Sequence, residues 1–262
     1  MSGSHDDDSR PSDDAIIAQL NDIERQVQDE QALVSVKESI SALQTEYTDT
    51  FNEVFLKKSK ELANVYGDIR RIRGDGNCFY RALVFAQAER MLTDGKELLR
   101  FKKVCEDWNA ALLKLGFPEF TTQDFCDTFL EFLGKIESGL KESELVDMFN
   151  DDGYSNYIVV FMRLVTSGYL QQNAEFYENF IAGERTLQEY CAQEVEPMFK
   201  VCDHLCIAAI TKALGIKLRI EYMDRTDAPA GGWQHDVPED HPGAPSLFFL
   251  YRHDHYDVLY PK

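Results

Sequence analysis

The chain has 262 residues, 44% of them hydrophobic, which is enough for one core of generous size and excludes global disorder. Asp and Glu total 46 against 27 Lys and Arg, and the formal charge of −19 excludes nucleic acid as the expected partner. We find no run of about 18 apolar residues and no signal-like N-terminus, so the protein is expected to be neither secreted nor membrane-spanning. Six cysteines are too sparse for a disulfide framework and indicate free thiols in a reducing compartment. We expect a cytoplasmic monomer, with the nucleus left open as a second location.

The first 47 residues divide into an acidic tail and an arm. Residues 1–14 hold five aspartates without periodicity and are predicted to be a disordered tail. Two sets of apolar residues at helical spacing follow and predict two amphipathic helices: Ile16, Leu20, Ile23 and Val27, then Val36, Ile40, Leu43 and Tyr47. We interpret 15–47 as a helical arm and 48–262 as the main domain. The first helix either packs on that domain or folds when a partner binds its apolar stripe.

The middle of the chain is predicted to be helical. After residues 69–73 come the turn residues Gly74, Asp75, Gly76 and Asn77, and then a helical pattern from Cys78 to Met91. Further helical patterns are found near residues 96–115, 122–137, 154–170, 174–182, 186–194 and 204–214. The 154–170 segment is almost wholly apolar, so we expect that helix to lie in the centre of the core.

The last fifty residues predict a sheet. Residues 216–222 alternate with period two, 247–251 are continuously apolar, and 256–260 are again typical of a strand. Residues 224–245 carry four prolines and three glycines, and we expect a long surface loop there.

Cys78 is a candidate nucleophile because of its place at a helix start. Acyl transfer needs the thiolate, and the unpaired amides and positive dipole end of a first helical turn favour that anion. Gly74 and Gly76 allow a close backbone approach, so amides near Asp75 and Cys78 are placed to face an oxyanion. A cysteine after such a turn is equally compatible with a small buried apolar residue.

His255 is the candidate base. If the last strand begins at His255, period two places His255, Asp257 and Leu259 on one face, so the Asp257 carboxylate can hold the imidazole. His253 competes for the role, and Asp254 points to the other face. The pattern therefore indicates a Cys–His–Asp triad, although spacing alone leaves an exposed His–Asp pair as an alternative.

A metal site is a weaker interpretation of Cys202, His204 and Cys206. A structural zinc ion needs four ligands, usually as two spaced pairs, whereas these residues open an apolar helix. We therefore expect core thiols, no metal and no cofactor.

The segment Gly74-Asp75-Gly76-Asn77-Cys78-Phe79-Tyr80-Arg81 resembles the nucleophile motif of the OTU family of ubiquitin-directed cysteine proteases. Segments that resemble its otubain branch follow in order, and the resemblance extends from about Ile16 to the end: 156–169, 194–198, 202–204, 220–225 and 255–260. It implies a papain-like α/β (α+β) fold, with a small sheet packed between helical layers and an N-terminal helical arm. It also implies that Cys78 is the nucleophile, His255 the base, Asp257 the orienting acid and Asp75 part of the oxyanion-hole segment.

The resemblance implies a deubiquitinating isopeptidase that favours the linkage marking proteins for the proteasome. Its implied partners are ubiquitin, polyubiquitin chains and a ubiquitin-conjugating (E2) enzyme, with the stripe Ile16, Leu20, Ile23 and Val27 as a ubiquitin-binding face. Two alternatives stay open: a non-catalytic inhibitor that binds a ubiquitin-charged conjugating enzyme, and an acyl-transferring enzyme that uses amines in place of water.

Overall fold

The computed structural model of the chain describes residue 19 and residues 31–47, 53–224 and 234–262. The predicted tail, 1–14, and the predicted helix with the stripe Ile16, Leu20, Ile23 and Val27 lie outside the described residues. Within the described ranges, none of the helices has the length and apolarity needed to cross a membrane.

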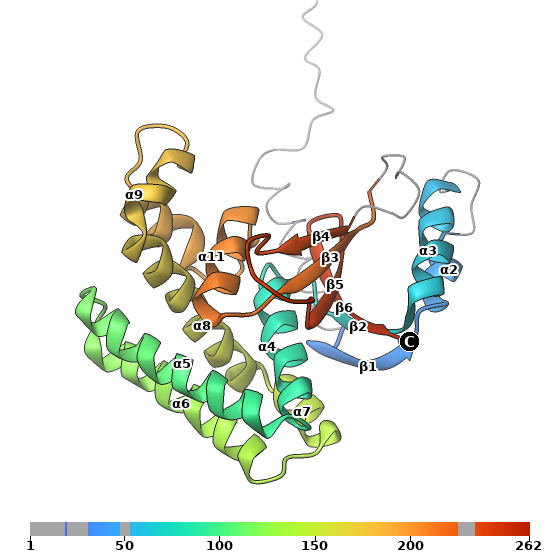
Figure 1. The fold of residues 1–262 in the computed structure, drawn as a ribbon, viewed down its shortest axis with the longest axis horizontal. Helices are drawn as coiled ribbons and strands as arrows, with labels where there is room; N and C mark the ends of the chain where they lie inside the picture. The colour runs from blue at the N-terminus through green and yellow to red at the C-terminus, as the bar shows by residue number, and fades with distance from the viewer. Residues whose placement is uncertain (1–18, 20–30, 48–52, 225–233) are drawn as a thin grey trace, which may run out of the picture.

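A six-stranded sheet in the order β1-β2-β6-β5-β3-β4 forms the centre of the molecule (Figure 1). Its strands are β1 (Val34–Ser39), β2 (Tyr66–Ile72), β3 (Leu218–Tyr222), β4 (Gln234–Val237), β5 (Leu247–Arg252) and β6 (His255–Pro261). Neighbouring strands are antiparallel except β3 and β5, which run parallel. The three C-terminal strands predicted from sequence are present, and β4 is an additional strand inside the predicted loop 224–245.

The helix predicted over Val36 to Tyr47 is wrong. Residues 34–39 form the edge strand β1, and only α2 (Ala42–Glu46) is helical. Ile40, Leu43 and Tyr47 are buried as the spacing suggested, but Val36 is 73% exposed and takes no part in that face. The pairing of β1 with β2 decided the conformation, and a local pattern does not reveal a partner some thirty residues away. This part of the predicted arm is therefore built into the sheet.

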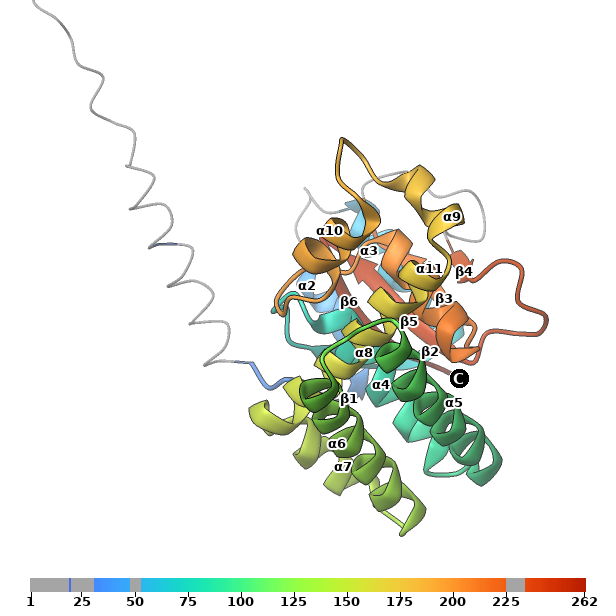
Figure 2. The ribbon, with the colours of Figure 1, turned by 90° about the vertical axis from the view of Figure 1, so that its left-hand side faces the viewer.

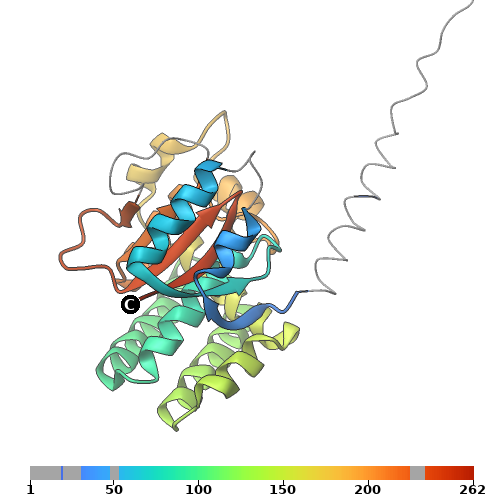
Figure 3. The same ribbon diagram turned by 90° about the vertical axis from the view of Figure 1, so that its right-hand side faces the viewer.

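Helices cover both faces of the sheet, which confirms the predicted fold class. One face is covered by α2 and α3 (Glu53–Val65), over a small core that includes Leu43, Phe55 and Leu259 (Figure 3). The larger helical layer lies on the other face (Figure 2). It contains α4 (Cys78–Met91), α5 (Gly95–Lys114), α6 (Glu119–Glu137), α7 (Glu142–Phe149), α8 (Asp152–Gln172) and α11 (His204–Leu214).

The predicted helices agree well with the observed ones. Helix α4 has the predicted bounds, and α11 covers the predicted 204–214. The predicted helix 174–182 is a short α9 (Ala174–Tyr177) continued by the 3-10 turn η2 (Glu178–Phe180). The predicted helix 186–194 is α10 (Leu187–Tyr190) continued by the π-helical turn η3 (Cys191–Val195). Helices α3 and α7 were not predicted.

Aromatic contacts fasten the start of α4 to the sheet. The ring of Phe79 lies 5.1 Å from that of Tyr256 on β6 and 5.9 Å from that of Phe249 on β5, both edge-to-face. Edge-to-face pairs at this spacing are favourable and geometrically specific. Because Phe79 follows Cys78 and Tyr256 follows His255, these contacts hold the two candidate catalytic residues on neighbouring elements.

Candidate active site

The nucleophile turn, residues 74–77, links β2 to α4 and leaves Cys78 as the first residue of the helix. The Cys78 side chain is buried, with 4% of the residue exposed. Gly76 has φ of +76°, and a Cβ at that position would meet the carbonyl oxygen of Phe199 at 2.4 Å. Only glycine therefore fits the turn, because any side chain would be both strained and obstructed.

The Asp75 carboxylate pairs with Arg81 on α4. Both of its oxygens accept from Arg81 Nη1, at 2.9 and 2.8 Å, and Oδ1 also accepts from the Asn77 amide at 2.9 Å. The Asp75 amide donates to the carbonyl of Arg73 at 3.1 Å. In this geometry Asp75 shapes the turn, and its amide is already used. The first-turn amide of Cys78 has no intrahelical acceptor and stays the better oxyanion candidate.

Arg163 on α8 also stabilises the nucleophile turn through hydrogen bonds. Its guanidinium donates to the carbonyls of Val195, Gly76 and Lys200, at 2.7–3.0 Å, and to the Asn77 side chain at 2.8 Å. Arg163 is 1% exposed and Arg81 is fully buried. Two buried guanidiniums therefore fix the backbone that presents Cys78.

The base side consists of His255 and Asp257, the first and third residues of β6. Their side chains share one face, as period two predicts, and His255 Nε2 lies 2.9 Å from Asp257 Oδ1. His253 instead packs against the ring of Phe55, with centroids 5.5 Å apart. Asp254 accepts from the Tyr251 hydroxyl at 2.7 Å. Of the two histidines, only His255 is in the triad position.

His255 lies between a carboxylate and the thiol. Burial alone would lower its pKa, but the hydrogen bond to Asp257 and the neighbouring thiol of Cys78 outweigh burial and raise the pKa of His255 to about 10. Its other ring nitrogen, Nδ1, has no hydrogen-bond partner within the described ranges. Because Nε2 is used by Asp257, Nδ1 is the nitrogen left to serve the neighbouring sulfur of Cys78.

Asp257 is fully buried, yet its pKa is lower than that of a free aspartate. Burial opposes its ionisation, but the hydrogen bond and positive charge of His255, the Arg252 guanidinium and the Ile72 amide together lower its pKa. The Ile72 amide donates to Oδ1 at 3.0 Å. A carboxylate held in this way fixes the imidazole orientation and stabilises its protonated form.

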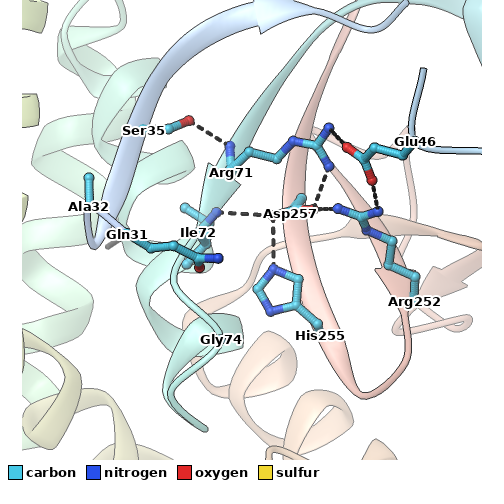
Figure 4. A pocket seen from close by; sticks show the side chains of 10 residues that line it. All are labelled: Gln31, Ala32, Ser35, Glu46, Arg71, Ile72, Gly74, Arg252, His255 and Asp257. Carbon is cyan, nitrogen blue, oxygen red and sulfur yellow. Dashed lines mark hydrogen bonds and ion pairs between the residues drawn. The ribbon is translucent and has the colours of Figure 1, made fainter. Parts of the chain in front are cut away.

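A cavity of about 600 Å³ opens beside the His255–Asp257 pair (Figure 4). Its lining comes from β1, α2, β2, the nucleophile turn, β5, β6 and the residues that precede β1: Gln31, Ala32, Ser35, Glu46, Arg71, Ile72, Gly74, Arg252, His255 and Asp257. Gly74 leaves room for the imidazole, because a Cβ there would lie 3.3 Å from His255 Nδ1. The residues entering from the N-terminal side, Gln31 and Ala32, thus lie at the edge of the triad.

No cluster of metal ligands exists among the described residues. Cys202 and Cys206 are buried free thiols, and the Tyr190 hydroxyl lies 3.6 Å from Cys206 Sγ. The His204 ring stacks on Tyr222. These contacts belong to helix entry and core packing.

Sequence reasoning missed the arginines that organise the site. Arg81 lies in the cysteine motif and Arg163 in the apolar segment 154–170, where a lone charge at a core position is the available signal. Arg71 and Arg252, which flank Asp257, offer no such signal, because each adjoins a turn or strand end where arginine is common.

A scan against protein families matches residues 26–261 to the Peptidase C65 Otubain family. Two curated proteins illustrate the similarity. The ubiquitin thioesterase otubain-like protein of Caenorhabditis elegans is 48% identical over 256 residues, covering 96% of this chain and 90% of that protein. The ubiquitin thioesterase OTUB1 of Homo sapiens is 43% identical over 248 residues, covering 95% and 90%.

Solved structures show the same fold in complexes. A structure of h/ceOTUB1 with ubiquitin aldehyde and UBC13~Ub matches with a TM-score of 0.91 and 48% identity, covering 95% of this chain and 98% of that one. A second, with ubiquitin aldehyde and UBCH5B~Ub, matches with a TM-score of 0.90 and 49% identity, at the same coverage.

Proposed function

The chain belongs to the otubain family, peptidase family C65, and we propose that it is a deubiquitinating enzyme whose nucleophile is Cys78. His255 is the base and Asp257 the residue that orients it. The observation that carries this assignment is the placement of His255, with Asp257 on one ring nitrogen and the Cys78 thiol beside the other. The reaction class is hydrolysis of the isopeptide bond between ubiquitin units.

The mechanism begins with proton transfer between Cys78 and His255. His255 takes the thiol proton, and the resulting imidazolium is stabilised by Asp257. The thiolate attacks the isopeptide carbonyl, and the negative charge that develops on oxygen lies near the Cys78 amide at the start of α4. His255 then gives its proton to the departing lysine amine, which leaves a thioester on Cys78. Water, deprotonated by His255, cleaves that thioester.

The nucleophile assignment is tested with Cys78→Ala. We expect cleavage of polyubiquitin to be abolished, while Cys126→Ala, which changes a buried thiol on α6, keeps wild-type cleavage. Ubiquitin aldehyde provides an independent measurement, since it should add covalently to wild type and to Cys126→Ala only. Cleavage that persists in Cys78→Ala would remove the assignment.

We further propose that the N-terminal arm sets the linkage preference, in favour of the linkage that marks proteins for the proteasome. The stripe Ile16, Leu20, Ile23 and Val27 is suited to an apolar patch on the ubiquitin that contributes the lysine. The residues that carry this stripe come shortly before Gln31 and Ala32 in the chain, and these two residues line the triad cavity. This position supports a role next to the leaving group.

The arm is tested with a panel of differently linked diubiquitins. Leu20→Asp combined with Ile23→Asp should lower cleavage of the preferred diubiquitin about tenfold or more, since two apolar anchors are lost. Gln19→Asp with Gln26→Asp, which adds the same charge outside the stripe, is the matched control. Cleavage of ubiquitin carrying a small fluorogenic C-terminal amide should be equal in all forms. A panel with no preferred linkage would contradict the proposal.

A second function, restraint of a ubiquitin-charged conjugating enzyme by binding, is favoured by the two solved relatives that hold UBC13~Ub and UBCH5B~Ub. In this function Cys78→Ala should still suppress ubiquitin transfer by the conjugating enzyme. Deleting residues 1–30 should relieve suppression and leave β1 and α2 intact. A longer deletion, through residue 47, would also remove the edge strand β1 and would not test the part of the arm that carries the apolar stripe by itself.

A further inference from the structure

The second oxygen of the Asp257 carboxylate is held by two arginines. Arg252 Nη2 lies 3.4 Å and Arg71 Nη1 3.6 Å from Asp257 Oδ2, whereas Oδ1 faces His255. Arg71 comes from β2 and Arg252 from β5, the strands on either side of β6. A fully buried carboxylate between two guanidiniums turns toward the strongest of its contacts. The two arginines therefore control how strongly Asp257 binds the imidazole of His255.

Glu46 on α2 holds both arginines at once (Figure 4). Its Oε2 accepts from Arg252 Nη1 at 2.5 Å, and its Oε1 accepts from Arg71 Nη2. Each guanidinium therefore uses one nitrogen for Glu46 and another for Asp257. Glu46 supplies a second carboxylate to the two arginines and draws both away from Asp257, toward α2.

This arrangement has a consequence for His255. Without Glu46, the region would hold one more uncompensated positive charge, and both guanidiniums would compete more strongly for Asp257. The His255 imidazolium would then have a weaker contact with Asp257, and the added positive charge of the guanidiniums would repel it. Glu46 is 38% exposed, so its ion pairs add little to folding stability, and its effect on the imidazole is separable from unfolding.

We propose that Glu46 is a positioning residue for hydrolysis: by bridging Arg71 and Arg252, it keeps the Asp257 carboxylate turned toward His255. The inference rests on the catalytic roles proposed above. The contacts of the Glu46 carboxylate are with Arg71 and Arg252, and it acts on His255 through these two arginines.

The charged groups around the His255–Asp257 pair come from five elements. They are Glu38 on β1, which accepts from Arg71 Nε at 2.7 Å, Glu46 on α2, Arg71 on β2, Cys78 on α4 and Arg252 on β5. Among the described residues, the Glu38 carboxylate forms an ion pair with Arg71 alone, so its removal disturbs one arginine and leaves the other in place.

The test is Glu46→Gln, measured on ubiquitin with a fluorogenic C-terminal amide. We expect kcat to fall about tenfold with KM nearly unchanged, because misorientation affects the chemical step and not ubiquitin binding. The alkaline limb of the pH profile of kcat/KM should move to lower pH, since the imidazolium is less stabilised. Glu46→Asp, which keeps the charge, should recover part of kcat.

Two further variants complete the experiment. Glu38→Gln should show a smaller effect of the same sign, and Glu137→Gln, which removes an exposed ion pair with Lys102 on α5, should match wild type. Unfolding midpoints should agree among all variants. A wild-type kcat and pH profile in Glu46→Gln would overturn the inference, as would a loss of activity that follows a lowered unfolding midpoint. An inactive wild type would overturn the proposed function itself.

Discussion

The two halves of the active site are held in different ways. The nucleophile turn is braced by Arg81 and Arg163, which are almost completely buried, whereas the His255–Asp257 side is surrounded by Arg71 and Arg252, at 22% and 17% side-chain exposure. Breaking a fully buried ionic contact leaves an uncompensated charge in the core, whereas arginines that reach solvent can still hydrate their charge, so their ion pairs contribute less to stability. The nucleophile half is therefore tied to folding, and the base half can be adjusted with less effect on the fold.

The largest effect is expected from Arg81→Met. The Asp75 carboxylate would lose both short contacts to Arg81 while buried, and we expect a loss of about 3–5 kcal/mol in unfolding free energy, measured by chemical denaturation. Arg185→Met, which removes an exposed pair with Glu194, should cost less than about 1 kcal/mol. Adding Asp75→Asn to Arg81→Met should recover part of the loss. Equal losses in Arg81→Met and Arg185→Met would show that the buried contact of the nucleophile half is no more tied to folding than an exposed ion pair.

Gly76→Ala should be the next most severe. Gly76 and Gly183 both have positive φ, +76° and +84°, so alanine is strained at either position. At Gly183 a Cβ meets nothing within 4 Å, and only the conformational cost of about 1–2 kcal/mol applies. At Gly76 the obstruction by Phe199 adds about 1–3 kcal/mol more. Thermal unfolding of both variants measures the difference directly, and similar midpoints would show that the Phe199 segment yields easily.

Gly74→Ala, unlike Gly76→Ala, should reduce activity more than stability. Its Cβ would lie 3.3 Å from His255 Nδ1, so the imidazole must shift by a few tenths of an ångström. We expect kcat/KM to fall about tenfold, with an almost unchanged unfolding midpoint. Gly67→Ala is the control, because Gly67 lies on β2 and a Cβ there would make an ordinary 3.7 Å contact with Lys262. A large drop in stability for Gly74→Ala would show that the base half is as tightly tied to folding as the nucleophile half.

The last effect is expected at alkaline pH. His255 has a pKa of about 10 when folded, against 6.5 for the free side chain, so folding favours its protonated form. This contribution to stability is complete below pH 6.5, declines above it and is lost as the pH rises through about 10. The difference in unfolding midpoint between wild type and His255→Ala should therefore shrink from pH 7 to pH 10. A constant difference would mean that His255 binds no extra proton in the folded chain.

Local patterns in the sequence were sufficient for the elements that carry the chemistry. The turn glycines and the apolar residues that follow predicted α4 with its observed bounds, and period two predicted the contact between His255 and Asp257. The fold class was implied by the resemblance to the OTU family, and the helical patterns in the middle of the chain and the strands at its end agree with it. Each of these depends on residues close together in the chain.

Contacts between distant residues could not be predicted in this way. The strand β1 was predicted as a helix because Ile40, Leu43 and Tyr47 do repeat at helical spacing, and its pairing partner lies in β2. The Arg163 brace requires Val195 and Lys200, more than thirty residues later, to return to the nucleophile turn. Glu46 and Arg252 are 206 residues apart, and no spacing rule would pair them.

The position of β6 in the sheet bears on how the enzyme matures. This strand lies between β2 and β5 although it follows every other strand in the chain, and it carries both His255 and Asp257. During synthesis, Cys78 and its helix therefore emerge well before the residues that activate the thiol. We therefore expect a stage of synthesis without catalytic capacity, which ends when β6 pairs with both β2 and β5.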